Sequence, residues 1–197
     1  MGNDEFDLAG TDGGVRGIFL DRDGVINDVI VRDGMPYPPP SLEALRVLPG
    51  VPETLAAFHR AGLRVIVVTN QPDVGSGKQD RQVVDQVHDW LTKQFPIDQI
   101  LVCFHVDADA CSCRKPQPGM LLAAADEWNL DLERCYLVGD RWRDIEAGQA
   151  VGCRTFWIDR GYRELAPNDP SHVVSSLAEA GRIILSELVA EEREMRT

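Results

Sequence analysis

Short apolar runs alternate with amphipathic stretches along most of this chain. Five runs predict buried strands, at 17–20, 63–68, 100–104, 135–138 and 153–158. Apolar residues at helical spacing follow them and predict helices at 52–61, around 84–91, at 121–128, up to 150, and from 176 onward. Alternating strands and helices favour a parallel sheet covered on both faces. The pattern therefore predicts an α/β protein with a three-layer αβα, Rossmann-like parallel sheet.

Two proline-containing segments interrupt this alternation. The stretch 27–50 is predicted to be a long loop without regular structure because of its prolines, among them Pro36, Pro38, Pro39 and Pro40. A turn-rich segment with Pro167 and Pro170 precedes the last helix. That helix is expected to begin at Ser176, because Glu179 three residues later completes a capping-box pattern.

Composition limits the partners that this chain is expected to bind. Its 197 residues, 44% of them hydrophobic, suit one globular domain, expected at 16–190. An acidic, glycine-rich leader at 1–15 and a tail at 191–197 flank it. The net charge of −12 repels nucleic acid and anionic lipid, so neither is an expected partner. With no membrane-spanning run and no signal peptide in the sequence, we expect a cytoplasmic monomer.

Three of the predicted strands end in polar side chains. In a parallel sheet these ends meet at one edge, where ligands bind in open α/β sheets. The expected cluster, with a lysine from a neighbouring loop, is Asp21, Asp23, Thr69, Asn70, Asp140, Asp144 and Lys115. Clustered carboxylates without histidine favour Mg²⁺, and hydroxyl and ammonium groups suit a phosphoryl group. The set predicts phosphoryl transfer through an aspartyl phosphate, although an Asp-Gly turn and a network of caps remain alternatives.

A loop at 103–113 has the pattern C-x-H-x5-C-x-C. Its three thiols and one imidazole are the ligand set of a closed, structural Zn²⁺ site: Cys103, His105, Cys111 and Cys113. The alternative is a set of buried thiols beside a histidine that binds nothing. The other cysteines, Cys135 and Cys153, lie in apolar strands and are predicted to be core residues. The remaining histidines (His59, His88 and His172) are predicted to lie on the surface or on helix faces.

Four segments in order, DRDGVIN, TNQ, RKP and GDRWRDI, resemble the four motifs of the haloacid dehalogenase (HAD) superfamily of phosphatases. The resemblance covers 17–161 and implies a HAD-like fold. It implies that Asp21 is the nucleophile and that Asp21, Asp23 (through its backbone carbonyl) and Asp140 hold Mg²⁺. Asp23 would be the general acid and then the base.

The same resemblance implies roles for three more residues. Thr69 and Lys115 would neutralise the transferring phosphoryl group, and Asp144 would orient Lys115 or the waters of the metal. Two rival functions remain open. A phosphate-accepting signalling domain also uses Asp, Thr and Lys around Mg²⁺, but it has no acid two residues after the nucleophile. A zinc-stabilised binding protein without catalysis is the other rival.

The cysteine loop directly before RKP narrows the resemblance. It is similar to the D-glycero-D-manno-heptose 1,7-bisphosphate 7-phosphatases and the related histidinol-phosphate phosphatases, which have no separate cap domain. This implies a small phosphorylated sugar or metabolite as substrate, first a heptose 1,7-bisphosphate and otherwise histidinol phosphate or another sugar phosphate. The implied substrate contacts are Arg32, Asn70, Gln71, Arg114 and Arg141. Phe104, and Gly-Ser-Gly after TNQ, depart from the pattern and leave the substrate open.

Overall fold

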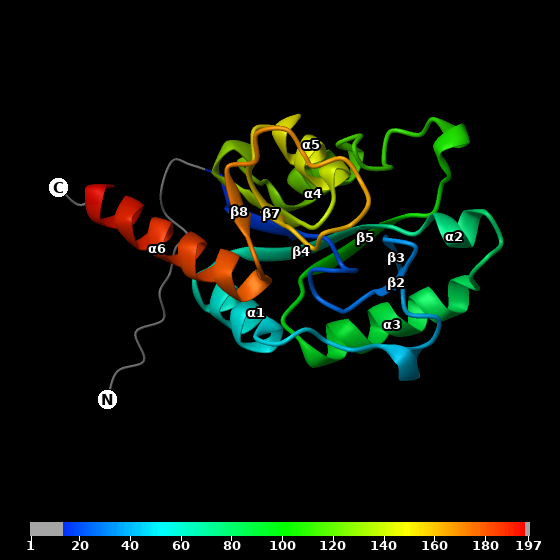
Figure 1. Cartoon of the computed structure of the whole chain (residues 1–197). Helices are drawn as coiled ribbons and strands as arrows, with labels where there is room; N and C mark the ends of the chain where they lie inside the picture. Colours follow the sequence, from blue (N-terminus) through cyan, green and yellow to red (C-terminus); the bar gives the residue numbers. More distant parts are fainter. Residues whose placement is uncertain (1–13, 196–197) are drawn as a thin grey trace.

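The computed structural model describes residues 14–195 and has one central parallel sheet (Figure 1). Its strand order is β5-β4-β1-β6-β7-β8, and every neighbouring pair is parallel. The strands are β1 (Gly17–Leu20), β4 (Arg64–Asn70), β5 (Gln99–Cys103), β6 (Tyr136–Gly139), β7 (Arg154–Ile158) and β8 (His172–Val174). The predicted fold class is confirmed. The prediction lacked β8, a three-residue strand inside the turn-rich segment.

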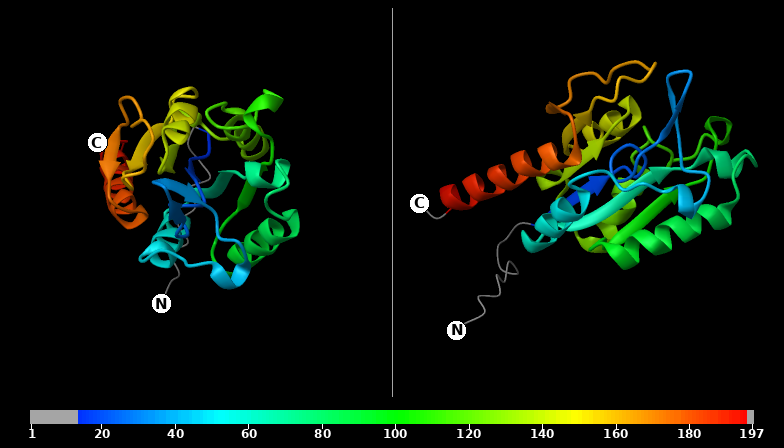
Figure 2. Two further views of the ribbon diagram at one scale, coloured as in Figure 1. Left: turned by 45° about the vertical axis from the view of Figure 1, so that its right-hand side comes forward. Right: turned by 60° about the horizontal axis from the view of Figure 1, so that its bottom comes forward.

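Helices cover both faces of this sheet, as Figures 1 and 2 show. One face carries α1 (Val51–Arg60), α3 (Arg81–Gln94) and α6 (Leu177–Met195), and the other carries α4 (Gly119–Trp128) and α5 (Trp142–Gln149). Successive strand side chains point to opposite faces. Ile18 and Leu20 therefore pack in the first core, and Phe19 packs in the second. Cys135 and Cys153 are buried in the second core, as predicted.

The long loop predicted at 27–50 contains regular structure, so that prediction was wrong. An antiparallel hairpin joins β2 (Ile30–Arg32) to β3 (Met35–Tyr37). Asp33 and Gly34 both have positive φ, as the favoured two-residue hairpin turn requires. Pro36 is opposite Val31, one pair from the turn, where antiparallel residues do not exchange hydrogen bonds, so its missing N–H costs the hairpin nothing.

Short helical turns complete the described fold. They are η1 (Leu42–Ala44), α2 (Pro72–Gly75), η2 (Asp107–Asp109) and η3 (Leu132–Arg134). Residues 14–195 form no separate cap domain, and no helix among them is long and apolar enough to cross a membrane. The leader predicted at 1–15 falls mostly outside the described residues.

The last helix differs from its prediction at both ends. Ser176 Oγ accepts from the Glu179 backbone N–H at 3.2 Å, but the Glu179 carboxylate reaches Ser175 N at 2.8 Å, one residue earlier than a standard capping box. The helix then continues to Met195, beyond the expected domain end at 190. Its buried face packs on α1, and its side chains from Leu177 to Leu188 join the first core.

Ile184 and Val189 allow this packing to be tested on one helix. Ile184 is fully buried and Val189 is 47% exposed. We expect Ile184→Ala to lower the free energy of unfolding by about 2–5 kcal/mol, because it removes buried methyl groups and leaves a cavity. Val189→Ala, the matched control, should change it by less than about 0.5 kcal/mol. Denaturant unfolding measures both. Equal effects would show that α6 does not dock as described.

Candidate active site

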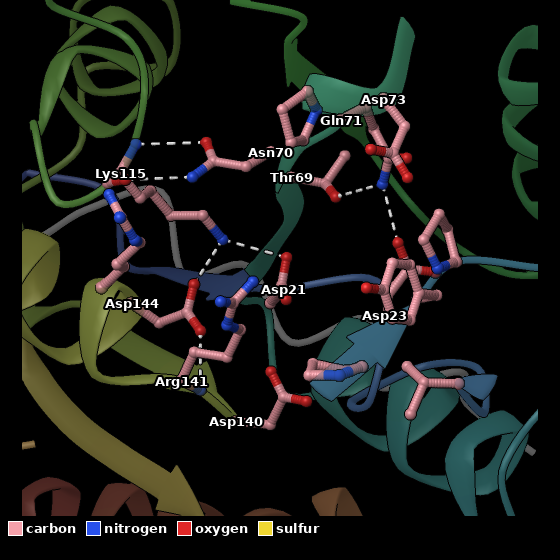
Figure 3. A pocket seen from close by; sticks show the side chains of 16 residues that line it. Asp21, Asp23, Thr69, Asn70, Gln71, Asp73, Lys115, Asp140, Arg141 and Asp144 are labelled. Carbon is pink, nitrogen blue, oxygen red and sulfur yellow. Dashed lines mark hydrogen bonds and ion pairs between the residues drawn. The ribbon is translucent and has the colours of Figure 1, made fainter. Parts of the chain in front are cut away.

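The polar side chains predicted at strand ends do meet at one edge of the sheet. Leu20 pairs with Val67 on β4 and with Val138 on β6, so the strands end side by side. The Asp21 N–H then continues the ladder to the Val138 carbonyl at 3.0 Å. The pocket at this edge, seen in Figure 3, is also lined by the β2–β3 hairpin and the residues after it.

A buried ammonium group holds two acids of the pocket together. Lys115 Nζ lies 2.9 Å from Asp21 Oδ1 and 2.5 Å from Asp144 Oδ1, and it donates to the Val68 carbonyl at 2.6 Å (Figure 3). Burial acts to lower the pKa of Lys115, but Asp144 and Asp21 raise it above its ordinary value overall. The lysine therefore stays charged, although only 2% of its surface is exposed.

One lysine does not balance the three acids beside it. Burial raises the pKa of Asp21 to about 6, with Lys115 opposing the shift and Asp144 adding to it. Burial and the charges of Asp21 and Asp144 raise the pKa of Asp140 well above its ordinary value. Ligand oxygens of the three acids lie within 4.8 Å of one another. The site therefore carries excess negative charge that a cation would relieve.

A hard divalent cation fits this arrangement. Asp140 Oδ1 is buried and has no hydrogen-bond partner among residues 14–195, as expected for an atom that ligates an ion. Gly24 gives the acid room, since a Cβ there would lie 1.8 Å from Asp140 Oδ2. Oxygen ligands alone favour Mg²⁺ over transition metals. Asp21 and Asp140 would hold the ion, and Asp144 stands next to them.

Asp23 has a different environment on the opposite side of the pocket (Figure 3). Its carboxylate accepts two hydrogen bonds from Arg22, one from Asn27 at 2.9 Å and one from Gln71 at 2.7 Å. Burial acts to raise the pKa of Asp23, but Arg22 and the two amides lower it below its ordinary value. Gln71 also donates to Thr69 Oγ1 at 3.0 Å. Two neighbouring acids, Asp21 and Asp23, thus have pKa values shifted in opposite directions.

Arg22 is almost fully buried behind Asp23. Its Nη1 donates to His88 Nε2 on α3 at 2.9 Å. Burial and the Arg22 charge lower the pKa of His88 to about 3, so the imidazole stays neutral and accepts this bond. The sequence prediction placed His88 on a helix face but did not give it this partner. No local motif signals the contact, because 66 residues separate the two side chains.

Of the five predicted substrate contacts, three line the pocket and two lie outside it. Asn70, Gln71 and Arg141 line the pocket. Arg114 instead lines a neighbouring cavity beside the cysteine loop, with its Nε 2.7 Å from Asp107 Oδ1. Arg32 is exposed on the hairpin, over the ring of Tyr37. Arg143, which the sequence analysis did not single out, lines both cavities.

The cysteine loop brings its four predicted ligands together. Cys113 Sγ lies 3.1 Å from Cys103 Sγ and 3.4 Å from Cys111 Sγ. His105 Nδ1 lies 3.4 Å from Cys113 Sγ and 3.5 Å from Cys103 Sγ. Zinc–thiolate bonds of about 2.3 Å would separate two sulfurs of a tetrahedron by about 3.8 Å, close to these spacings. The four atoms therefore form a closed cluster of the size that one Zn²⁺ ion needs.

Comparison with known proteins identifies the family. The HAD-hydrolase-like family model matches residues 112–180. The D-glycero-β-D-manno-heptose-1,7-bisphosphate 7-phosphatase of Rhodopseudomonas palustris is 36% identical over 150 residues, which cover 70% of this chain and 80% of that protein. The enzyme of the same name from Escherichia coli K12 is 30% identical over 185 residues, covering 86% and 94%. The chain belongs to the HAD phosphatase family.

A solved structure agrees with this assignment. The D,D-heptose 1,7-bisphosphate phosphatase from B. bronchiseptica, complexed with magnesium and phosphate, superposes with a TM-score of 0.75 at 29% identity. The alignment covers 87% of this chain and 99% of that one. The resemblance to HAD phosphatases predicted from the four motifs is confirmed. The roles of individual residues of this HAD phosphatase stay predictions.

Protons and Mg²⁺ should compete for this site. The pKa of Asp21 is raised to about 6 from an ordinary 3.8. As the pH falls, Asp21 is therefore protonated at a higher pH in the folded, metal-free protein than in the unfolded chain. Its contribution to stability is therefore present at low pH and lost as the pH rises through about 6. Mg²⁺ binds the ionised acids, so its binding and the stability that it adds increase as the pH rises and the acids lose their protons.

We therefore expect saturating Mg²⁺ to raise the melting temperature at about pH 7.5 and to lose this effect as the pH falls through about 6. Thermal unfolding with and without Mg²⁺ across this range measures the difference. Asp140→Asn, which removes a ligand charge, should show little Mg²⁺ effect at any pH. An effect in the unsubstituted protein that is equal at about pH 5 and pH 7.5 would contradict the assignment of the acids.

Proposed function

We propose that this HAD phosphatase hydrolyses the 7-phosphate of D-glycero-β-D-manno-heptose 1,7-bisphosphate through an aspartyl phosphate on Asp21. The observation that carries the proposal is the pairing of Asp21, held by Lys115, with a second acid, Asp23, that has an opposite pKa shift. The names of the relatives support the substrate. Absence of nucleic-acid and membrane partners, a cytoplasmic location and a monomeric state stay predictions.

In the first step Asp21 attacks phosphorus. Lys115 holds Oδ1 of Asp21, and Oδ2 would form the new O–P bond while the bond from phosphorus to the sugar oxygen breaks. Lys115 and the Thr69 hydroxyl would neutralise the oxygens of the transferring group, as preorganised donors do in such sites. When bound, Mg²⁺ supplies further positive charge at these oxygens. Asp23 in its protonated form would donate a proton to the departing sugar oxygen.

Asp23 would then act as a base in the second step. It would take a proton from water as that water attacks phosphorus, which breaks the O–P bond to Asp21 and releases phosphate. In the free protein Arg22 keeps Asp23 ionised, the form needed for this step. A bound phosphate dianion would raise the pKa of Asp23 by like-charge repulsion, toward the protonated form that the first step needs.

One lining residue supports a second substrate. Asp73 lies in the pocket wall, two residues before the Gly-Ser-Gly segment that departs from the heptose phosphatase pattern. A carboxylate there would favour a substrate that carries an amine, so histidinol phosphate remains the alternative.

The presence of Asp23 argues against the non-catalytic alternatives. A domain that only accepts and keeps a phosphoryl group does not need an acid/base group beside the nucleophile.

The cysteine cluster is proposed to hold a structural Zn²⁺. Burial, together with the side-chain contacts with Cys113 and Cys111, raises the pKa of Cys103 to about 12, so without a metal its thiol would stay protonated. A bound Zn²⁺ would be four-coordinate, which leaves no open position for substrate. The loop leads directly into Arg114 and Lys115. A metal there would therefore fix the segment that delivers the catalytic lysine.

The reaction is tested by Asp21→Asn and a matched control. We expect Mg²⁺-dependent phosphate release to fall at least about a thousandfold, because an amide cannot form the acyl phosphate. Asp126→Asn makes the same chemical change on the exposed side of α4 and should retain full activity. Phosphate release from the heptose bisphosphate, histidinol phosphate and simple sugar monophosphates is compared. No Mg²⁺-dependent release from any of them would overturn the proposal.

Metal analysis tests the cysteine loop separately. We expect one Zn²⁺ per chain by elemental analysis, and its loss together with a lower melting temperature in Cys111→Ser, because the ion stabilises the folded loop. Cys153→Ala, in the second core, should keep its zinc. If the unsubstituted protein contained no zinc and Cys111→Ser left the melting temperature unchanged, the cluster would be only a group of neighbouring thiols.

A further inference from the structure

A five-residue segment shortly after β7, residues 160–164, contacts the metal site at Gly24 and at Asp140. We call this segment the 160–164 strap; no sequence motif marks it. Arg160 donates to the Gly24 carbonyl through Nε at 3.0 Å and Nη2 at 2.8 Å. Tyr162 donates its hydroxyl proton to Asp140 Oδ2 at 2.8 Å. The strap thus holds both the turn after Asp23 and one of the expected metal ligands.

Two further contacts tie the strap to the rim of the pocket. The Arg163 backbone N–H donates to the Gly34 carbonyl at the turn of the β2–β3 hairpin, at 2.8 Å. Glu164 accepts from Arg141 Nε at 2.7 Å. Figure 2 shows the segment after β7, in orange, beside the blue hairpin. The Tyr162 phenol therefore lies between neighbours that are themselves anchored, and it is not a freely rotating surface side chain.

The two oxygens of Asp140 have different surroundings. Oδ2 accepts from Tyr162 and lies against Gly24, where even a Cβ would come within 1.8 Å. Oδ1 is buried without a partner in the described part of the chain. Trp157 Nε1 donates to the Asp140 backbone carbonyl at 3.1 Å and holds the main chain as well. The phenol thus prevents the carboxylate from turning and keeps Oδ1 available to a cation.

We propose that Tyr162 is a positioning residue for the metal site, acting through Asp140. This inference rests on the proposed Mg²⁺ site and adds a residue that lies outside the four motifs. Partners that hold a ligating carboxylate in place commonly contribute a factor of about 10–100 to metal affinity. Tyr162 donates its hydroxyl proton to Asp140 and does not line the pocket beside Asp21, so loss of this hydroxyl should weaken metal binding rather than substrate binding.

Tyr162→Phe removes only the hydroxyl group and tests this role. Mn²⁺ alone is the probe, followed by its electron paramagnetic resonance signal, and Mg²⁺ affinity is obtained by displacement. We expect both ions to bind at least about tenfold more weakly than to the unsubstituted protein. Tyr136→Phe is the matched control, because Tyr136 is buried in the first core and does not line the pocket that holds the three acids. That variant should bind Mn²⁺ normally.

Kinetics separate positioning from a structural role. In Tyr162→Phe the Mg²⁺ concentration for half-maximal phosphate release should rise by the same factor, while kcat and KM at saturating Mg²⁺ return to near their original values. Unchanged Mn²⁺ affinity with a lower melting temperature of the metal-free protein would overturn the inference. Tighter Mn²⁺ binding would also overturn it, by showing that the phenol blocks the site.

The binding measurement needs no substrate. A failure of the proposed heptose phosphatase activity would therefore leave the Mn²⁺ result intact. Failure of the unsubstituted protein to bind Mn²⁺ or Mg²⁺ would instead overturn both the metal site and the role of Tyr162. The two proposals can thus fail independently in the experiment.

Discussion

The contact on which the active site depends is the ion pair of Lys115 with Asp21 and Asp144. Burying charges is unfavourable unless they are paired and hydrogen-bonded. Lys115 satisfies this condition with two carboxylates and the Val68 carbonyl, all inside the protein. Among residues 14–195, Asp140 Oδ1 is buried without a hydrogen-bond partner, and this is where we expect an ion to bind. The same interaction thus positions the nucleophile and creates the need for a metal.

The fold supplies this contact from distant parts of the chain. Parallel pairing of β1 with β4 and β6 places Asp21, Thr69 and Asp140 at one edge. Lys115 lies on the loop that directly follows the cysteine cluster. The β2–β3 hairpin lines the pocket, and the 160–164 strap contacts this hairpin at Gly34.

The sequence predicted most of the sheet and most of the acids because their signals are local. Apolar runs, glycines and motif spacing lie within a few residues of one another. The hairpin was missed because the prolines outweighed the Asp33-Gly34 turn, although that dipeptide is itself a hairpin signal. The partners of Arg22 and Asp140 were missed for another reason. His88 and Tyr162 meet them only after folding, and neither residue belongs to a motif.

By itself, the sequence determined the fold class, the order of the four motifs, the set of acids with its lysine, and the four residues of the cysteine cluster. These depend on residue type and spacing along the chain. Only the tertiary structure decided how the charges act. Desolvation and neighbouring charges shift the pKa of Asp21 upward and that of Asp23 downward, although both are aspartates two positions apart. Such shifts arise from burial and from long-range partners, which a linear sequence does not contain.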